Sequence, residues 1–422
     1  MNDAVPIPTS SLQALIRRRR PNFSLEAPFY TSPEIFKADI DFIFHRHWIY
    51  VGVEPDVPEP GDVVTVTIGG TSVVIVRDDD MEVRAFHNVC RHRGARLVTE
   101  EKTTVGNLVC KYHQWTYGLT GDLLYAEHMG KDFDKSCRNL KPVALRNIAG
   151  LLFICLADNP PDDIEQMAAT MAPYIAPHQV ANTKIAYQAD LIEPGNWKLT
   201  MENNRECYHC SVNHPELTIP LFANSYGFEP GEGDELGIEQ ARRYDEMVAE
   251  RTATWEARGL PSREVEHLAD RITGFRTQRM PLDGTGQSQT MDTKVACRKL
   301  LGDFTDPAIG GLSFWTQPNS WHHFMSDHIV TFSALPLDAG RTLVRTKWLV
   351  HKDAVEGVDY DIENLTTVWK ATNQQDSDLV GLGQLGVVSP AYEPGPYSPN
   401  TEYLVEKFIA WYVDRMSEHV KA

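Results

Sequence analysis

The chain reads NVCRHRGARL at residues 88–97 and LVCKYHQWTY at residues 108–117. Each stretch holds one cysteine and one histidine, spaced C-x-H and then C-x2-H with seventeen residues between the pairs: Cys90 and His92, then Cys110 and His113. Two thiolates and two imidazoles are a complete ligand set for a metal centre. The surrounding chain must therefore fold so that it holds these two loops together.

This ligand set is that of a Rieske-type [2Fe-2S] cluster, in which two cysteines bind one iron and two histidines bind the other. Tetrahedral zinc is the alternative, because two cysteines and two histidines also suit that ion. Zinc fingers pair C-x2-C with H-x3-5-H, however, whereas each loop of this chain mixes the two residue types. The spacing therefore favours the [2Fe-2S] cluster.

Short β-type runs surround the two loops. DVVTVTI, TSVVIVR and MEVRAFHN precede them, with Gly69-Gly70 as a turn signal, and LRNIAGLLFICLA follows. Pro160-Pro161 marks the exit from this pattern. We therefore expect a small all-β domain over residues 45–160. Residues 1–44 should form an arm and a helix, because PEIFKADIDFIFHRHW carries apolar residues at helical spacing.

Residues 161–422 mix strand-like and helical patterns and are expected to form a second domain, which makes the fold class α+β. GLSFWTQP, DHIVTFSALPL and TLVRTKWLVH are the strand-like runs. Between about residues 223 and 290 the chain is polar and charged. This stretch predicts a helical insertion, which either covers an active site or forms a solvated pair of helices.

The composition is that of a soluble globular protein, with 422 residues, 42% hydrophobic residues and a formal net charge of -18. This charge argues against nucleic acid and anionic membrane surfaces as partners. Seven cysteines, of which two are assigned to the cluster, argue against a disulfide scaffold. No apolar run is long enough for a signal peptide or a membrane span, so we expect a cytoplasmic protein.

A second group of ligand-type side chains follows in GNWKLTMENNRECYHCSVNHPEL, residues 195–217. A helix over residues 197–208 would place three of them on one face: Asn203, Glu206 and His209. His214 lies five residues after His209, about 140° around an ideal helix, so both bind one metal only if the helix breaks. Pro215 favours such a break. The two histidines therefore predict half of a metal site.

The third ligand is expected from DIENLTTVWKATNQQDSDLVGL, residues 361–382. Two histidines and one carboxylate form the facial triad of non-haem Fe(II) oxygenases. Helical spacing puts Asp376 on a mostly apolar face with Trp369 and Thr372, whereas Asp378 lies on a polar face. A carboxylate facing the core is costly unless it is paired or binds a metal, which favours Asp376. Structural roles for these residues stay open at this point.

The cluster motif, followed by MENNRECYHCSVNH and NQQD, resembles the α subunit of Rieske non-haem iron oxygenases from about residue 25 to 415. The resemblance implies a helix-grip catalytic domain after the Rieske domain, a head-to-tail homotrimer and a separate NAD(P)H-dependent flavin and iron-sulfur reductase. It implies that His209, His214 and Asp376 bind mononuclear Fe(II). Glu206 takes the place of the carboxylate that bridges a neighbouring subunit's cluster to the iron ligand, and Asn203 matches a family position near the iron.

Within this family, FSLEAPFY, NSWHHFMSDH, WLVHKDAVEGVDYD and SPAYEPGPYS are similar to glycine betaine monooxygenases and related betaine demethylases. Many ring-hydroxylating members have Asp at the position of Glu206, which also favours this branch. SDLVGLGQ after Asp376 departs from the relatives, which tend to carry charged residues there. The implied reaction is O2-dependent N-demethylation of glycine betaine to dimethylglycine and formaldehyde. Proline betaine, carnitine or choline as substrate, and an aromatic-ring dihydroxylase on the same scaffold, are the alternatives.

Other interpretations are weaker. The family's respiratory-chain type has an extra cysteine in each cluster loop, where this chain has Ala95 and Tyr112. A Rieske ferredoxin would need only about 110 residues, and a pure electron carrier whose second domain only docks partners is a further alternative. The G-x-G-x-x-G at residues 381–386 leads into SPAYEPGPYS, so we expect a loop rather than a dinucleotide site. Cys207 and Cys210 form a C-x2-C pair around His209, for which a redox thiol pair is the lesser alternative.

Recognition of a quaternary ammonium should rest on aromatic faces and nearby anions. The aromatic candidates are Trp321, Tyr208 and Phe314, although core packing is the better expectation for each of them. His322 and His323 alternate across a predicted strand, so one of them faces the pocket or both are structural.

Overall fold

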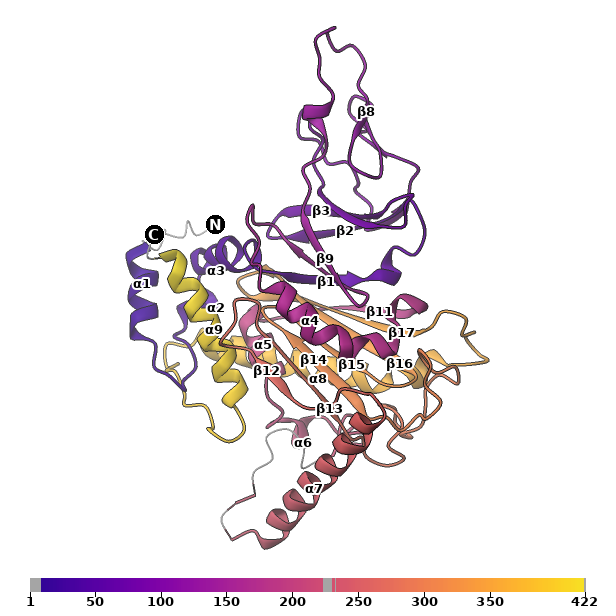
Figure 1. The fold of residues 1–422 in the computed structure, drawn as a ribbon. Coiled ribbons are helices and arrows are strands. Elements are labelled where there is room, and N and C mark those ends of the chain that lie inside the picture. Colours follow the sequence, from indigo (N-terminus) through magenta and orange to yellow (C-terminus); the bar gives the residue numbers. More distant parts are fainter. Residues whose placement is uncertain (1–8, 223–229, 232, 421–422) are drawn as a thin grey trace.

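The structure is a computed structural model that describes residues 9–222, 230–231 and 233–420 (Figure 1). Residues 1–8 of the predicted arm, and 223–229 and 232 of the predicted insertion, lie outside this range. The described part of the arm is helical: α1 (Thr9–Arg18), α2 (Pro28–Thr31) and α3 (Pro33–Asp39), which continues into a π-helical turn at Ile40–Phe44. The helix predicted from PEIFKADIDFIFHRHW is thus confirmed over α3 and this turn.

Three small antiparallel sheets, ordered β4-β3-β2-β5, β6-β7-β8 and β1-β10-β9, form the cluster region in the upper part of Figure 1. Their strands are β1 (Ile49–Val53), β2 (Asp62–Ile68), β3 (Thr71–Arg77), β4 (Val83–His87), β5 (Lys102–Thr104), β6 (Leu108–Val109), β7 (Thr116–Tyr117), β8 (Leu123–Tyr125), β9 (Ala144–Ile148) and β10 (Leu151–Cys155). The predicted Gly69-Gly70 turn joins β2 to β3, and both glycines have positive φ, 54° and 88°.

One seven-stranded antiparallel sheet, ordered β11-β17-β16-β15-β14-β13-β12, forms the centre of the second region. Its strands are β11 (Thr183–Glu193), β12 (Val265–His267), β13 (Phe275–Met280), β14 (Gly311–Thr316), β15 (Ser320–Phe324), β16 (His328–Asp338) and β17 (Arg341–His351). The first of these strands in the chain, β11, pairs with the last, β17, so β11 and β12 form the two edges of the sheet. The helical insertion predicted over residues 223–290 is only partly correct, because Glu235–Ala257 is helical but β12 and β13 complete this sheet.

Helix α4 (Ile164–Ile175) packs on one face of this sheet, and α5 (Trp197–Asn204) and α8 (Ile362–Val387) pack on the other. The remaining helices are α6 (Cys210–Asn213), α7 (Glu235–Ala257), which projects away from the sheet in Figure 1, and α9 (Tyr403–Val420), which packs against α5 and α1. Short 3-10 turns lie at Glu54–Asp56, Ser136–Arg138, Ala176–His178 and Val180–Asn182. Within the described residues, no helix is long and apolar enough to cross a membrane. The result is the α+β fold that the sequence predicts.

Strand alternation assigns neighbouring side chains of the sheet to opposite faces. Phe314 packs in the core cluster that contains α4, whereas Trp315 packs in the cluster that contains α5 and α8. His322 contacts Phe314 and so follows the α4 face, while His323 stacks on Trp369 of α8. The face of the sheet that packs against α8 is therefore the one that can line a functional site.

Candidate metal centres

The two cluster loops adopt the same turn. Cys90 N donates to the Ala95 oxygen at 2.8 Å, and Cys110 N donates to the Trp115 oxygen at the same distance. The fourth residue after each cysteine has positive φ, 77° at Gly94 and 58° at Gln114, and its amide donates back to the cysteine carbonyl. Equivalent turns present each Cys–His pair in the same way, although the two spacings differ by one residue.

Within these loops the sulfurs are buried and the imidazoles are exposed. Cys90 is 2% and Cys110 is 1% exposed, and burial together with the neighbouring Cys90 raises the pKa of the Cys110 thiol. The rings of His92 and His113 lie at the surface with centroids 4.6 Å apart. Two adjacent buried thiols and two adjacent exposed imidazoles fit a cluster in which the cysteines bind one iron and the histidines bind the other. Surface histidines also suit electron transfer to another molecule.

The second centre brings together the three predicted metal ligands. The Nε2 atoms of His209 and His214 lie 3.0 Å apart, and Asp376 Oδ1 lies 3.3 Å from the first and 3.1 Å from the second. Three donors that each lie about 2.1 Å from one ion, at right angles, are separated by roughly 3.0 Å. The set therefore fits one octahedral face of a divalent ion, with the opposite face open, as in a 2-His-1-carboxylate centre.

Hydrogen bonds outside this triad orient both rings. Glu206 Oε1 accepts from His209 Nδ1 at 2.5 Å, and Gln375 Oε1 accepts from His214 Nδ1 at 2.8 Å. With Nδ1 protonated, each Nε2 lone pair is left for the metal, which is the usual arrangement of histidine ligands. Gln375 was not predicted from sequence, although it directly precedes Asp376 and its place in NQQD is the signal that points to it.

Asn203 and Asp376 are joined directly, because Asn203 Nδ2 donates to Asp376 Oδ1 at 2.6 Å. Asn203 lies in the last turn of α5, which begins at the cap Asn196 and ends at Asn204. The predicted helix over residues 197–208 is therefore too long. His209 and His214 instead flank α6 as its two cap residues, and this short helix supplies the break that lets both rings converge.

The triad is electrostatically negative. Burial opposes protonation of His209, but hydrogen bonds to Asp376 and Glu206 outweigh it and raise the His209 pKa to about 9. Burial likewise opposes ionisation of Asp376, yet its two histidine neighbours lower the Asp376 pKa overall. The negative charge that favours a proton between these groups also favours a divalent cation bound there instead of the proton.

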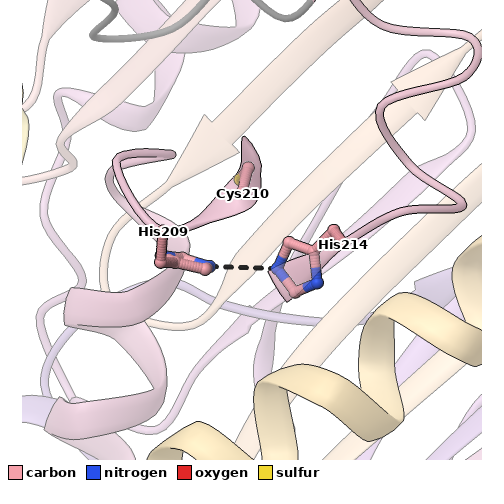
Figure 2. A group of neighbouring side chains, drawn as sticks. All are labelled: His209, Cys210 and His214. Carbon is pink, nitrogen blue, oxygen red and sulfur yellow. Dashed lines mark hydrogen bonds between the residues drawn. The ribbon is translucent and has the colours of Figure 1, made fainter. Parts of the chain in front are cut away.

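Cys207 and Cys210 form a disulfide in this structure, and the other five cysteines are free. The sulfur of Cys210 lies close enough to His209 and His214 to suggest a third ligand, but a disulfide sulfur is not a thiolate. Figure 2 shows the two imidazoles facing each other across their Nε2 contact, with Cys210 set back from it. Asp376 is therefore the better third donor.

A pocket with about 490 Å³ of empty space, part of it open to solvent, lies beside the triad. Its lining adds to the metal ligands and Glu206 a wall of apolar and aromatic side chains: Leu217, Leu221, Trp315, His323 and Trp369. The sequence analysis did not single out Leu217, Leu221 or Trp315, and it placed Trp369 on the face of Asp376 without naming it as a pocket residue. Of the aromatic residues predicted, Phe314 and Trp321 are buried outside this lining and Tyr208 is 65% exposed.

Two further predictions need correction. The G-x-G-x-x-G at residues 381–386 lies inside α8, not in a loop, and so lacks the strand and turn of a dinucleotide site. The described part of the insertion does not line the triad pocket. Tyr244, Asp245 and Val248 of α7 line a neighbouring hollow that also reaches Glu206 and Cys207.

The two centres lie far apart within one chain. In Figure 1 the β6-β7-β8 sheet that carries one cluster loop stands at one end of the molecule, and α6 lies toward the other. Strand β1 and the seven-stranded sheet lie between them.

Comparison with known proteins agrees with both centres. Residues 47–144 match the Rieske [2Fe-2S] domain and residues 180–418 match the ring hydroxylating alpha subunit (catalytic domain). The chain is 45% identical to the glycine betaine monooxygenase oxygenase subunit of Pseudomonas aeruginosa (strain UCBPP-PA14), over 95% of this chain and 91% of the relative. It is 43% identical to that of Chromohalobacter salexigens, over 100% of this chain and 92% of the relative.

A similar fold is found in a crystal structure of the quaternary ammonium Rieske monooxygenase CntA. Its TM-score is 0.71 and its sequence identity 21%, over 98% of this chain and 99% of that one.

Proposed function

Because the chain belongs to the ring-hydroxylating α subunit family of Rieske non-haem iron oxygenases, we propose that it is the oxygenase component of a glycine betaine monooxygenase. The observation that carries this proposal is the identity of 43–45% to proteins of that name over almost their whole length. The reaction is O2-dependent N-demethylation to dimethylglycine and formaldehyde.

We assign residues 45–160 to the Rieske domain, 161–422 to the catalytic domain and 1–44 to the N-terminal arm. Cys90, His92, Cys110 and His113 would hold the cluster, and His209, His214 and Asp376 would hold Fe(II). The iron supplies activation of O2 when it is bound. Glu206 and Gln375 keep the two imidazoles in the required orientation, and Asn203 does the same for the Asp376 carboxylate.

The pocket suits a cation beside the triad. The described residues that line it include the carboxylates Glu206 and Asp376 but no lysine or arginine. A trimethylammonium group has no N–H to donate, so carboxylate charge and aromatic surface are what can attract it. Insertion of one atom of O2 into an N-methyl C–H bond gives an N-hydroxymethyl group, while two electrons from NAD(P)H and two protons reduce the other atom to water. The C–N bond of the N-hydroxymethyl group then breaks, which releases formaldehyde, a proton and the tertiary amine.

A homotrimer would provide the electron route. The separation of the two centres within one chain supports transfer from the cluster of one subunit to the iron of its neighbour. Glu206, bonded to the iron ligand His209, would accept a hydrogen bond from His113 of that neighbour. A separate NAD(P)H-dependent reductase would reduce the cluster. We place the protein in the cytoplasm, where this reductant is available.

A formaldehyde assay tests the proposal. The purified holoenzyme, a compatible reductase and NADH are incubated with glycine betaine, proline betaine, carnitine or choline. We expect formaldehyde and dimethylglycine in equal amounts from glycine betaine, with lower rates from the others. No formaldehyde from any of the four substrates would show the demethylase proposal to be wrong, and a cis-diol from an aromatic substrate would favour a ring dihydroxylase.

A further inference from the structure

The polar groups that line the triad pocket leave few hydrogen-bond donors for a substrate. The Nδ1 atoms of His209 and His214 are bonded to Glu206 and Gln375, and their Nε2 atoms face the metal position. Other donors are also in use: Asn203 Nδ2 bonds Asp376, Trp369 Nε1 bonds Gln289 at 2.9 Å and Thr372 Oγ1 bonds the Val368 oxygen at 2.9 Å.

The Asn204 amide nitrogen and the His323 ring are side-chain donors in the lining that make no hydrogen bond to another described residue. Asn204 accepts at Oδ1 from Arg205, at 2.5 Å, but its nitrogen bonds none of the described residues. Neither ring nitrogen of His323 bonds a described residue. A partly buried imidazole without a partner loses free energy that a bound ligand can restore.

These two donors lie in different electrostatic surroundings. Asn204 is held by the Arg205 guanidinium, which donates to its Oδ1. His323 lies in the aromatic wall, stacked on Trp369 with centroids 4.4 Å apart and planes at 25°. Burial and the nearby His328 lower the His323 pKa to about 3, so the ring is a neutral donor.

The pocket runs along α8 between these two sides. Trp369, Thr372 and Asp376 all line it, spaced three and four residues apart, so they share one face of the helix. Seven residues of helix separate the Trp369 and Asp376 positions by about 10 Å. With the carboxylates at one end and a neutral imidazole at the other, a small zwitterion would place its cation toward Asp376 and its anion toward His323.

We propose that His323 donates a hydrogen bond to the substrate carboxylate and so selects short betaines whose N-methyl groups then point at the metal. This inference rests on the proposed function and deepens it by naming the residue that binds the carboxylate of the substrate. Trp315 is a poor ammonium site, because Arg205 and Arg276 each place a guanidinium carbon 5.0 Å from its ring centroid. The wall formed by His323 and Trp369 therefore determines how the substrate lies.

The test measures binding without turnover, by calorimetry on the anaerobic holoenzyme. The two probes are glycine betaine and ethyltrimethylammonium, which replaces the carboxylate with a methyl group and keeps the cation. His323→Phe retains a flat ring on Trp369 and removes the donor, and His323→Gln restores a donor. His351→Phe is the matched control, because His351 lies at the end of β17 outside the pocket lining. Cluster absorbance and iron content check that each variant is folded.

We expect His323→Phe to weaken glycine betaine binding about 10- to 100-fold and to change ethyltrimethylammonium binding by less than about threefold. His323→Gln should recover part of the loss, and His351→Phe should bind both probes like the wild type. Equal losses for the two probes, or no loss for either, would overturn the assignment. The ratio of the two affinities is the readout, so a reduced folded fraction does not affect it.

Failure of the proposed function gives a different result. A wild-type protein that releases no formaldehyde and binds neither probe overturns both proposals. A wild-type protein that demethylates glycine betaine, with an unchanged affinity ratio in His323→Phe, overturns only the role of His323. If His323→Phe does not fold, His323→Gln and His323→Leu form the donor and no-donor pair, and the same ratio decides.

Discussion

Replacing Gln375 with leucine should weaken iron binding without touching an iron ligand. Gln375 connects two groups, since its Oε1 accepts from His214 Nδ1 at 2.8 Å and its Nε2 donates to Glu216 Oε2 at 2.7 Å. Leucine has a similar size and offers neither bond. His214, which is 1% exposed, then has no fixed acceptor for its Nδ1 proton, and its ring is free to present the wrong nitrogen.

The size of the effect follows from what is lost. A net hydrogen bond contributes about 0.5–1.5 kcal/mol, and the mispositioned ring adds the cost of reorienting it. Partners of this kind typically change metal affinity about 10- to 100-fold, equivalent to about 1.4–2.8 kcal/mol. Glu216 adds little, because it is only partly buried and water can replace the lost donor.

Iron counting against a competing chelator measures this change. The Rieske cluster is an internal standard, because its two irons are bound by other residues. The neighbouring Gln374→Leu is the control, since the Gln374 side chain is exposed and, among the described residues, bonds Asp378 on the same side of α8. We expect Gln375→Leu to lose the mononuclear iron at a chelator concentration that leaves Gln374→Leu and the wild type loaded. Equal iron retention in all three would contradict the role assigned to Gln375.

Three further predictions concern carboxylates. Glu206→Gln should keep its iron and its cluster, but reoxidation of the reduced cluster should become about 100-fold slower in stopped-flow absorbance. Glu402→Gln is the control, and equal rates in the two variants would exclude Glu206 from the electron route. Asp376→Asn should lose the mononuclear iron and all formaldehyde release while retaining the cluster's EPR signal, and full iron occupancy would exclude Asp376 as a ligand. Burial raises the Glu202 pKa from 4.5 to about 7, so its neutral form stabilises the folded state below pH 4.5 and this contribution is lost as pH rises through 7. The wild type should therefore lose about 3 kcal/mol of unfolding free energy relative to Glu202→Gln between pH 4.5 and 8, and parallel pH profiles in urea denaturation would exclude this.

The cluster loops were predictable because all of their information is local. Each Cys–His pair lies within four residues, and each loop closes through its own backbone bonds. The converging histidines were predicted for a partly wrong reason, since α5 ends at Asn204 rather than near Tyr208. Arg205, the next residue, is fully buried and donates to the Thr316 oxygen 111 residues later. No local propensity encodes such a contact, and it helps fix where the helix stops.

The pocket wall was missed because alternation along a strand shows which residues share a face, but not which of the two faces lines the pocket. Phe314 and Trp315 are adjacent in a strand, so a shift of one residue exchanges which of them faces α8. Helical spacing carried more information, since Trp369 and Thr372 were correctly placed on the face of Asp376 and do line the pocket. The strand residues could have been assigned only by knowing which face of the sheet packs against that helix.

The surroundings of Glu206 agree with the proposed transfer between subunits. Its two oxygens already accept from His209 Nδ1 and from the Tyr208 amide, yet a carboxylate has about four acceptor sites, so a further donor can bind without breaking either contact. The flanking apolar side chains are unusually open, with Tyr208 65% and Val212 83% exposed. A partly buried carboxylate bordered by exposed apolar groups is what a docked protein surface would cover. The proposed docking of a neighbouring subunit would therefore cover Glu206, the residue that orients the His209 ring.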